Sequence, residues 1–300
     1  MIILLGSETD PQIRHLYNRL LERGQTPWAL DTQQFGCQWT LSFLPDSAVG
    51  AIECTNQRVP WTHITAVYWH QYRPPAGTQD SARSHMMDHV STLQSWFRCP
   101  AIHWVNGIDA IRYHQCKPIQ LQHARQLGVQ IPATWIGNNS ESALAFARDH
   151  QTLIVKPVHG GETATRLNSQ DTERLCARLA LSPATVQACI PGTNIRTYVI
   201  GEKVFHFALD TTHTDFRTDT TVVPEVASAP DAVTQQAKAI CRAFGMHWCA
   251  IDWRRTGDNT YYFLEANPCP YFLYVENTTG VDLSGALMTL LISRDKQKSP

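Results

Sequence analysis

The sequence is short of charge, and above all of lysine. Charged residues are 17% of the 300, and the 25 basic residues are 19 Arg and 6 Lys. The first 116 residues contain no lysine. The net charge is −1 and no segment is strongly basic. This excludes an electrostatic nucleic-acid or membrane-surface binder, because such partners require a concentrated positive patch.

Other features are absent as well. The first six residues are apolar and Ser7 is polar, so we expect no secretory signal, which requires a basic start and a longer apolar region. No uncharged apolar run approaches the ~20 residues that span a bilayer. The nine cysteines are scattered singly, without a Cys-x-x-Cys pair, which indicates reduced thiols rather than disulfides or a zinc site. We therefore expect a cytoplasmic protein.

What is present suits two or three domains with substantial cores, since 43% of the residues are hydrophobic. The N-terminal pattern predicts a small doubly wound α/β domain over residues 1–105. Its expected elements are a strand at Ile2–Leu5, a helix at 12–23, a strand at 27–30 and a strand at Ala66–Trp69. Loops beyond the carboxyl ends of such strands bind ligands, which makes Arg73 a candidate for contacting a substrate anion.

From about residue 106 the pattern changes, and the sequence predicts an α/β (α+β) fold with two further parts, 106–184 and 185–300. Helices are expected at 118–127, 140–149, 171–181, 233–244 and 283–293. Strands are expected at 151–158, 185–190, 196–200, 203–209, 248–254 and 260–265, with antiparallel pairing beyond Pro183.

The strongest chemical signal is a hairpin near the C-terminus. A two-residue turn at Asp258 and Asn259 would place Asp252 directly opposite Glu265, with Asn267 on the same face of the sheet. Carboxylates that face each other repel unless a cation lies between them. Two carboxylates and an amide oxygen suit Mg²⁺ or Mn²⁺ completed by water and phosphate, and do not suit zinc.

Two lysines stand in unusual places. Lys156 interrupts an apolar strand, where an ammonium requires an anionic partner. Gly160 and Gly161 follow this strand, and a glycine pair lets the backbone approach phosphates closely. Lys117 lies at a helix start, where anions are favoured. These residues indicate a site for a phosphate-bearing ligand.

Taken together, these segments resemble the ATP-grasp superfamily over about residues 106–292. The resemblance rests on seven segments in family order: Lys117-Pro-Ile-Gln-Leu-Gln-His-Ala, Ile154-Val-Lys-Pro157, Val186-Gln-Ala-Cys-Ile190, Asn194-Ile-Arg196, Asp215-Phe-Arg217, Ile251-Asp252 and Phe263-Leu-Glu-Ala-Asn267. Within the superfamily the chain is similar to the ribosomal-protein glutamate ligase branch. The segment Pro270-Tyr-Phe-Leu-Tyr-Val-Glu276 with the later Thr-Gly brings it nearest to the graspetide (microviridin-type) peptide cyclases.

The resemblance implies a role for each matching residue. Lys117, Lys156, Gly160 and Gly161 would bind the ATP phosphates, and Asp252, Glu265 and Asn267 would hold Mg²⁺ or Mn²⁺. The adenine and ribose would contact Gln187, Ala188, Cys189, Ile190 and Asn194. Arg196 and Arg217 would stabilise the transferring phosphoryl group and the tetrahedral intermediate, a role that suits the planar, permanently charged guanidinium.

The implied reaction joins a carboxylate to an amine or hydroxyl through an acylphosphate, on a peptide substrate such as a precursor peptide with a leader. Two alternatives stay open: the same chemistry with free amino acids or small peptides, and a nucleotide-binding module without catalysis. A homo-oligomer is also compatible with the resemblance. The chain departs from the family at Ala188, at Asn194 and in the Pro-Cys-Pro-Tyr segment after Asn267, and this last departure bears on substrate choice.

Overall fold

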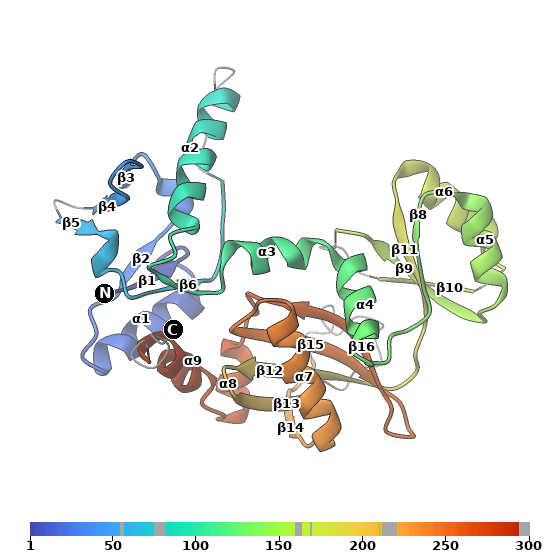
Figure 1. The fold of residues 1–300 in the computed structure, drawn as a ribbon. Helices are drawn as coiled ribbons and strands as arrows, with labels where there is room; N and C mark the ends of the chain where they lie inside the picture. The colour runs from blue at the N-terminus through green and yellow to red at the C-terminus, as the bar shows by residue number, and fades with distance from the viewer. Residues whose placement is uncertain are drawn as a thin grey trace. The chain divides into compact units, whose positions relative to one another are not determined.

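The computed structural model describes residues 1–54, 57–74, 82–159, 164–168, 170–209, 211 and 221–293 (Figure 1). The chain forms two compact units. The first comprises residues 1–111, 245–248 and 268–300, and the second comprises residues 112–244 and 249–267. The C-terminal helices therefore pack with the N-terminal part of the chain.

A four-stranded parallel sheet, ordered β2-β1-β6-β7, forms the centre of the first unit. Its elements are β1 (Ile2–Leu5), α1 (Pro11–Glu22), β2 (Trp28–Leu30), β6 (Ala66–Trp69), α2 (Ala82–Phe97), β7 (His103–Val105), α8 (Leu273–Thr279) and α9 (Leu283–Ile292), and α3 (Ile108–Gln115) begins in this unit and ends in the second. Helix α1 connects β1 to β2, whereas α2 connects β6 to β7 and lies on the opposite face of the sheet. The predicted doubly wound start of the chain is confirmed.

Asp10 and Pro11 determine where helix α1 begins. The Asp10 carboxylate accepts hydrogen bonds from the backbone N–H groups of Gln12 and Ile13, and Pro11 occupies the first turn. The helix ends before Gly24, whose φ of 72° lies in the left-handed region. Ile13, with the leucines at helical spacing behind it, faces the core.

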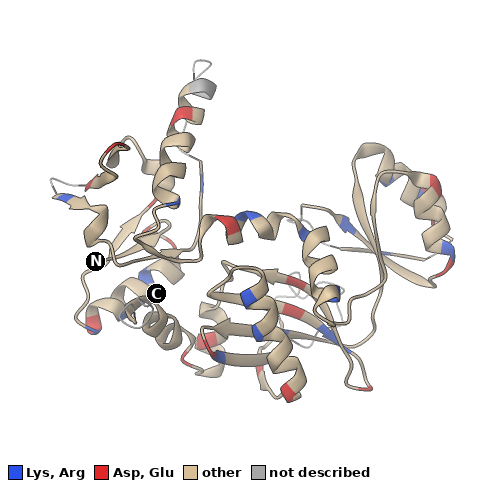
Figure 2. Cartoon of the chain, viewed as in Figure 1, with Lys and Arg blue, Asp and Glu red and all other residues tan. Residues whose placement is uncertain are grey.

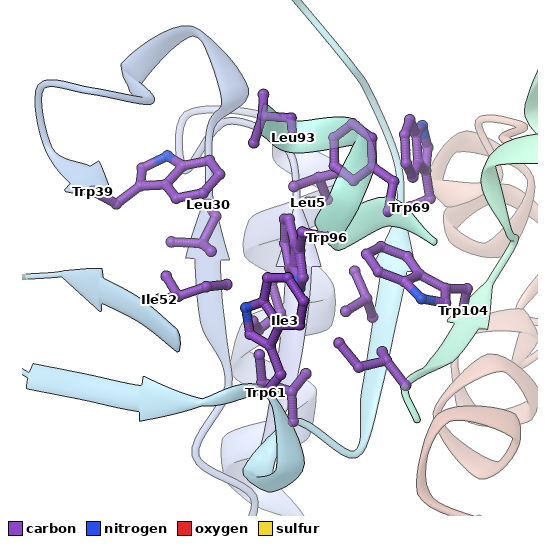
Figure 3. Packing of buried hydrophobic residues seen from close by; sticks show 14 of the residues in the cluster. Ile3, Leu5, Leu30, Trp39, Ile52, Trp61, Trp69, Leu93, Trp96 and Trp104 are labelled. Carbon is purple, nitrogen blue, oxygen red and sulfur yellow. The ribbon is translucent and has the colours of Figure 1, made fainter. Parts of the chain in front are cut away.

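One face of the parallel sheet is covered by an aromatic core (Figure 3). Ile3 and Trp69 project from the sheet toward Trp96 of α2. A second, antiparallel sheet of β3 (Trp39–Leu44), β4 (Val49–Cys54) and β5 (Gln57–Pro60) adds Trp39 to the same cluster, and a short 3-10 helix directly after β5 adds Trp61. The sequence did not predict this small sheet or helix α2.

The second unit holds two antiparallel sheets, ordered β10-β9-β11-β8 and β14-β13-β12-β15-β16. Its strands are β8 (Thr134–Gly137), β9 (Thr152–Pro157), β10 (Thr165–Asn168), β11 (Ala184–Ala188), β12 (Thr193–Ile200), β13 (Lys203–Leu209), β14 (Glu225–Ala227), β15 (Trp248–Arg255) and β16 (Tyr261–Asn267). Its helices are α4 (Lys117–Gln126), α5 (Ser140–Arg148), α6 (Thr172–Leu181) and α7 (Asp231–Ala243). The predicted α/β (α+β) class and the antiparallel pairing are confirmed.

One face of each of these sheets packs against helices. Helices α5 and α6 share a core with Leu153 and Val155 of β9, so Lys156 lies on the opposite face of the strand. Helix α7 covers the other sheet on the face of Trp253, where Thr234 of α7 bonds to a histidine of β13. Basic and acidic side chains are interspersed over the described chain (Figure 2). None of the described helices is long and apolar enough to cross a membrane.

Candidate functional site

The β15–β16 hairpin brings the three predicted metal ligands onto one face. Asp252 pairs directly with Glu265, and Asn267 pairs with Ala250, two residues before Asp252. Since alternate residues of a strand share a face, all three oxygen-bearing side chains lie on the face opposite α7. The predicted pairing of the two carboxylates is confirmed.

The turn itself differs from the prediction. Thr256 bonds through its N–H to the Thr260 carbonyl, so three residues form the turn instead of two, and Asn259 takes a φ of 65°. This moves the pairing by one residue near the turn. One extra residue on β16, Leu264, forms a bulge between the Trp253 and Asp252 pairs and restores the expected register. The two-residue turn was therefore wrong, and the bulge compensates for it.

Each carboxylate has a basic partner from another element. Nε and Nη2 of Arg196 on β12 donate to the two oxygens of Asp252, both at 2.8 Å, in a bidentate pair. Lys117, at the start of α4, donates to Oε2 of Glu265. The side chains of both pairs are 11–24% exposed. The two opposed carboxylates are therefore each paired with a basic side chain.

The electrostatics of Glu265 follow from these neighbours. Burial on its own would raise the pKa of its carboxyl group. The ammonium group of Lys117, with Lys156 and His114 further away, outweighs burial and lowers the pKa of Glu265 to about 2. Glu265 is thus ionised throughout the physiological pH range, as a ligand of a hard cation must be.

The backbone between the ligands is fixed by two residues that the sequence prediction missed. The buried Gln120 accepts from the N–H of Ala266 and donates to its carbonyl, both at 3.0 Å. Nδ1 of His114 donates to the same carbonyl at 2.9 Å. Because Glu265 and Asn267 flank Ala266, these contacts set the direction of both side chains. Nothing in the local sequence singles out Gln120.

Lys156 lies on the polar face of the other sheet, next to a second buried amide. Its Nζ is 3.4 Å from Oε1 of Gln187, whose Nε2 donates to the hydroxyl of Thr134 at 2.9 Å. Gln187 is 2% exposed. The structure thus brings Lys156, Lys117 and the carboxylate hairpin into one unit, with Lys156 acting electrostatically on Glu265.

The predicted adenine strand has part of its backbone already paired. The N–H groups of Ala188 and Cys189 donate to the carbonyls of Ala133 and Thr152, at 2.9 and 3.0 Å. An adenine base would therefore have to use other backbone groups of this segment. The carbonyl of Ile190 accepts from Nε of an arginine on β15 at 3.0 Å.

That arginine, Arg254, was also missed, and it orients Asn194. Its Nη1 donates to Oδ1 of Asn194 at 2.8 Å, which leaves Nδ2 of the amide buried without a hydrogen-bond partner among the described residues. A buried donor without an acceptor is costly, so this atom calls for a ligand oxygen. A ribose hydroxyl is such an acceptor, which fits the predicted place of Asn194.

The donor set also fits a hard divalent cation. No group of three or more His, Cys, Asp or Glu side chains among the described residues could hold a metal ion. Two carboxylates and an amide oxygen are instead the incomplete oxygen set that Mg²⁺ accepts, because it keeps several waters and takes phosphate oxygens from a substrate.

Gly160, Gly161 and Arg217 lie outside the described residues. Arg73 lies in the first unit, just after β6.

No protein-family model and no curated protein matches the chain, but solved structures do. The macrocyclase MdnC of Microcystis aeruginosa MRC, bound with precursor peptide MdnA, has a TM-score of 0.85 and 22% identity, over 97% of this chain and 99% of that one. The ATP-grasp ligase PsnB, complexed with a phosphomimetic variant of its minimal precursor, Mg and ADP, has a TM-score of 0.84 and 25% identity, over 98% of both chains. A Chryseobacterium gregarium RiPP-associated ATP-grasp ligase, in complex with ADP and a leader and core peptide, has a TM-score of 0.88 and 20% identity, over 97% and 96%.

Proposed function

We propose that this chain, which has the ATP-grasp fold, is an ATP-dependent ligase that joins a carboxylate to a hydroxyl or amine of a peptide substrate. The observation that carries the proposal is the opposed pair Asp252 and Glu265, set among Arg196, Lys117 and Lys156 in one unit. The structural neighbours that are complexed with precursor peptides, with ADP or with Mg support a peptide as the substrate and ATP with Mg²⁺ as the cofactors.

In this proposal the acidic, basic and amide side chains of the site have separate roles. Asp252, Glu265 and Asn267 would hold Mg²⁺, which supplies charge neutralisation at the phosphate oxygens when bound. Lys117 and Lys156 bind the phosphates as point charges. Arg196 fixes Asp252 and, with Arg217, is our candidate for stabilising the transferring phosphoryl group. The orphaned Asn194 amide receives the ribose, while Gly160 and Gly161 are proposed to close over the phosphates.

The reaction has two balanced steps. A carboxylate oxygen of the peptide bonds to the γ-phosphorus as the bond to the β–γ bridging oxygen breaks, and ADP leaves. The hydroxyl or amine then bonds to the acyl carbon as the carbon–oxygen bond to phosphate breaks, with the nucleophile's proton passing to solvent. The product is an ester or amide with inorganic phosphate. Positioning and electrostatic stabilisation supply most of the catalysis in such transfers.

The deciding experiment is mass spectrometry of candidate precursor peptides, encoded near the gene, after incubation with the protein, ATP and Mg²⁺. We expect each new bond to remove the mass of one water from the peptide, with one ADP formed per bond. A gain of one amino-acid residue would instead establish a ligase for free amino acids. ADP formation that is absent with every peptide and amino acid would favour a nucleotide-binding module without catalysis.

Lys156→Ala is expected to weaken nucleotide binding by at least about tenfold, because a partly buried charge-assisted contact to phosphate is lost. Calorimetric titration with ADP and Mg²⁺ measures this. Lys203→Ala is the matched control, since Lys203 is exposed at the start of β13. Equal affinity of the Lys156 variant and the control would remove Lys156 from the phosphate site.

Two further parts of the proposal concern the cellular compartment of the protein and the boundaries of its domains. All nine cysteines are free thiols in the structure, which supports a reducing compartment, and we propose the cytoplasm. The finer division at residues 105 and 184 remains a prediction.

A further inference from the structure

The polar face of strands β12, β15 and β16, which are neighbours in one sheet, carries its side chains in rows across the strands. Glu265, Asp252 and Arg196 form the first row. Arg254 and Asn194 form the next, because each lies two residues along its strand from the first row and alternate residues share a face. Strand geometry places the two rows about 6–7 Å apart. All five residues belong to the second unit.

The direction of the Asn194 amide is determined by the chemistry of Arg254. A guanidinium group donates hydrogen bonds and never accepts them, so the amide atom that lies 2.8 Å from its Nη1 is the oxygen, Oδ1. The amide nitrogen Nδ2 must then point away from Arg254. Asn194 is only 8% exposed, and this nitrogen is buried without a hydrogen-bond partner among the described residues. The second row therefore offers a fixed donor to a ligand on this face.

Arg254 also fastens the segment that joins the two sheets of the second unit. Its Nε donates to the carbonyl of Ile190 at 3.0 Å. Two residues later, Gly192 has a φ of 142°, and a side chain there would collide with the carbonyl oxygen of Arg255. The segment between β11 and β12 is thus held against β15 at two adjacent positions. The fold of this unit therefore keeps Arg254 and Asn194 in place.

The position of the second row indicates which part of a nucleotide meets Asn194. Asp252 and Glu265, in the first row, are proposed above to hold the metal ion at the phosphates. Arg254, in the second row, also contacts Ile190, which belongs to the segment predicted to contact adenine and ribose. The sugar of a nucleotide lies between its phosphates and its base, and the sugar hydroxyl oxygens can accept hydrogen bonds. The second row therefore corresponds to the sugar.

We propose that Arg254 is a specificity-determining residue of the nucleotide site. By holding Oδ1 of Asn194, it directs Nδ2 at the sugar, so that the site donates a hydrogen bond and requires a hydroxyl oxygen there. The inference rests on the proposed function and adds to it a preference for ribonucleotides over deoxyribonucleotides. Arg254 is a positioning residue, because it acts on the sugar through Asn194.

The preference arises from a buried donor that cannot turn away. A deoxynucleotide leaves Nδ2 of Asn194 unpaired in the complex, whereas a ribose hydroxyl oxygen satisfies it. The amide cannot reverse to avoid this loss, since its nitrogen would then face the guanidinium of Arg254 with two donors opposed. The penalty is therefore that of a buried polar group without a partner, about tenfold or more in affinity.

Calorimetric titration with ADP, 2′-deoxy-ADP and 3′-deoxy-ADP, each with Mg²⁺, tests the proposal. We expect wild type to bind at least one of the two deoxynucleotides about tenfold or more weakly than ADP. Arg254→Met keeps a long side chain but removes its donors, so the amide is free to turn. The penalty should then fall to about threefold or less. Since the base and phosphates are the same in all three ligands, the ratio of affinities reports on the sugar alone.

Two controls separate this role from a structural one. Arg255→Met changes the next residue of β15, whose side chain points to the other face and forms no hydrogen bond or ion pair with another described residue. This variant should keep the wild-type ratios. Pyrophosphate with Mg²⁺, which has no sugar, should bind wild type and Arg254→Met with equal affinity.

The remaining outcomes overturn the proposal. Equal affinity of wild type for ADP and both deoxynucleotides would remove the sugar contact, and an unchanged ratio in Arg254→Met would mean that Asn194 is oriented without it. Both results leave the proposed function intact. Loss of pyrophosphate binding together with ADP binding in Arg254→Met would point to a role in folding. If wild type binds neither ADP nor pyrophosphate with Mg²⁺, the proposed nucleotide site itself fails.

Discussion

Glu265→Gln is expected to lower ATP turnover by roughly a thousandfold, because several kcal/mol of charge stabilisation at the phosphates depend on the metal that this carboxylate would hold. Glutamine keeps the size and one oxygen of the side chain but removes its charge. The change also leaves the ammonium group of Lys117 without its ion-pair partner. ADP release in a coupled assay, with excess Mg²⁺ and substrate peptide, measures the effect.

The fold should survive this substitution, since Gln120 and His114 hold the backbone of β16 on their own. Circular dichroism and thermal melting check this. Glu202→Gln is the matched control: Glu202 also pairs with basic side chains, Arg242 and Lys238, but lies on the surface. Turnover of Glu265→Gln within about tenfold of wild type would remove Glu265 from the metal site.

How far the sequence predicts this site is best seen at the hairpin. A two-residue turn, assumed at Asp258 and Asn259 between two apolar strands, placed Asp252 opposite Glu265. The same reasoning misjudged the turn by one residue, and the bulge at Leu264 corrected the pairing. Local turn chemistry is a weaker constraint than the burial of Trp253 and Phe263 on the other face, so the core determined the register.

The basic partners of Asp252 and Glu265 could not be predicted from the sequence in this way. Arg196 and Lys117 stood out as basic residues for phosphate, but nothing local showed that they pair with Asp252 and Glu265, which lie 56 and 148 residues away. Gln120 reads as an ordinary helix residue, and its double bond to Ala266 exists only in the folded unit. Side-chain contacts between distant segments leave no periodic trace in the sequence.

The small antiparallel sheet was missed for a different reason. Strand β3 buries only Trp39 fully, and it exposes Phe43 and Leu44 near its end. Its residues Trp39 to Phe43 do alternate between apolar and polar, so the pattern of a half-buried strand was present and the sequence prediction overlooked it. Helix α2 likewise turns its core residues, Leu93 and Trp96, inward only in its last turns. Both elements contribute to the aromatic core of the first unit, through Trp39 of β3 and through Leu93 and Trp96 of α2.

The largest effect on stability is expected from Asn106→Leu, about 3–5 kcal/mol in the free energy of unfolding. Asn106 is fully buried in the first unit. Its Oδ1 accepts from the N–H groups of His247 and Trp248, and its Nδ2 donates to the carbonyls of Trp248 and Pro268, at 2.8 and 2.7 Å. Leucine has a similar volume but satisfies none of these four backbone groups, and each buried group without a partner is costly.

This substitution tests whether one amide fastens the returning C-terminal chain to the N-terminal sheet. Thermal unfolding followed by tryptophan fluorescence should show a fall in Tm on the order of 10 °C. Asn277→Leu, on the exposed side of α8, is the control and should lie within about 0.5 kcal/mol of wild type. If Asn106→Leu lowers the stability as little as the control does, water satisfies the four backbone groups in place of the amide.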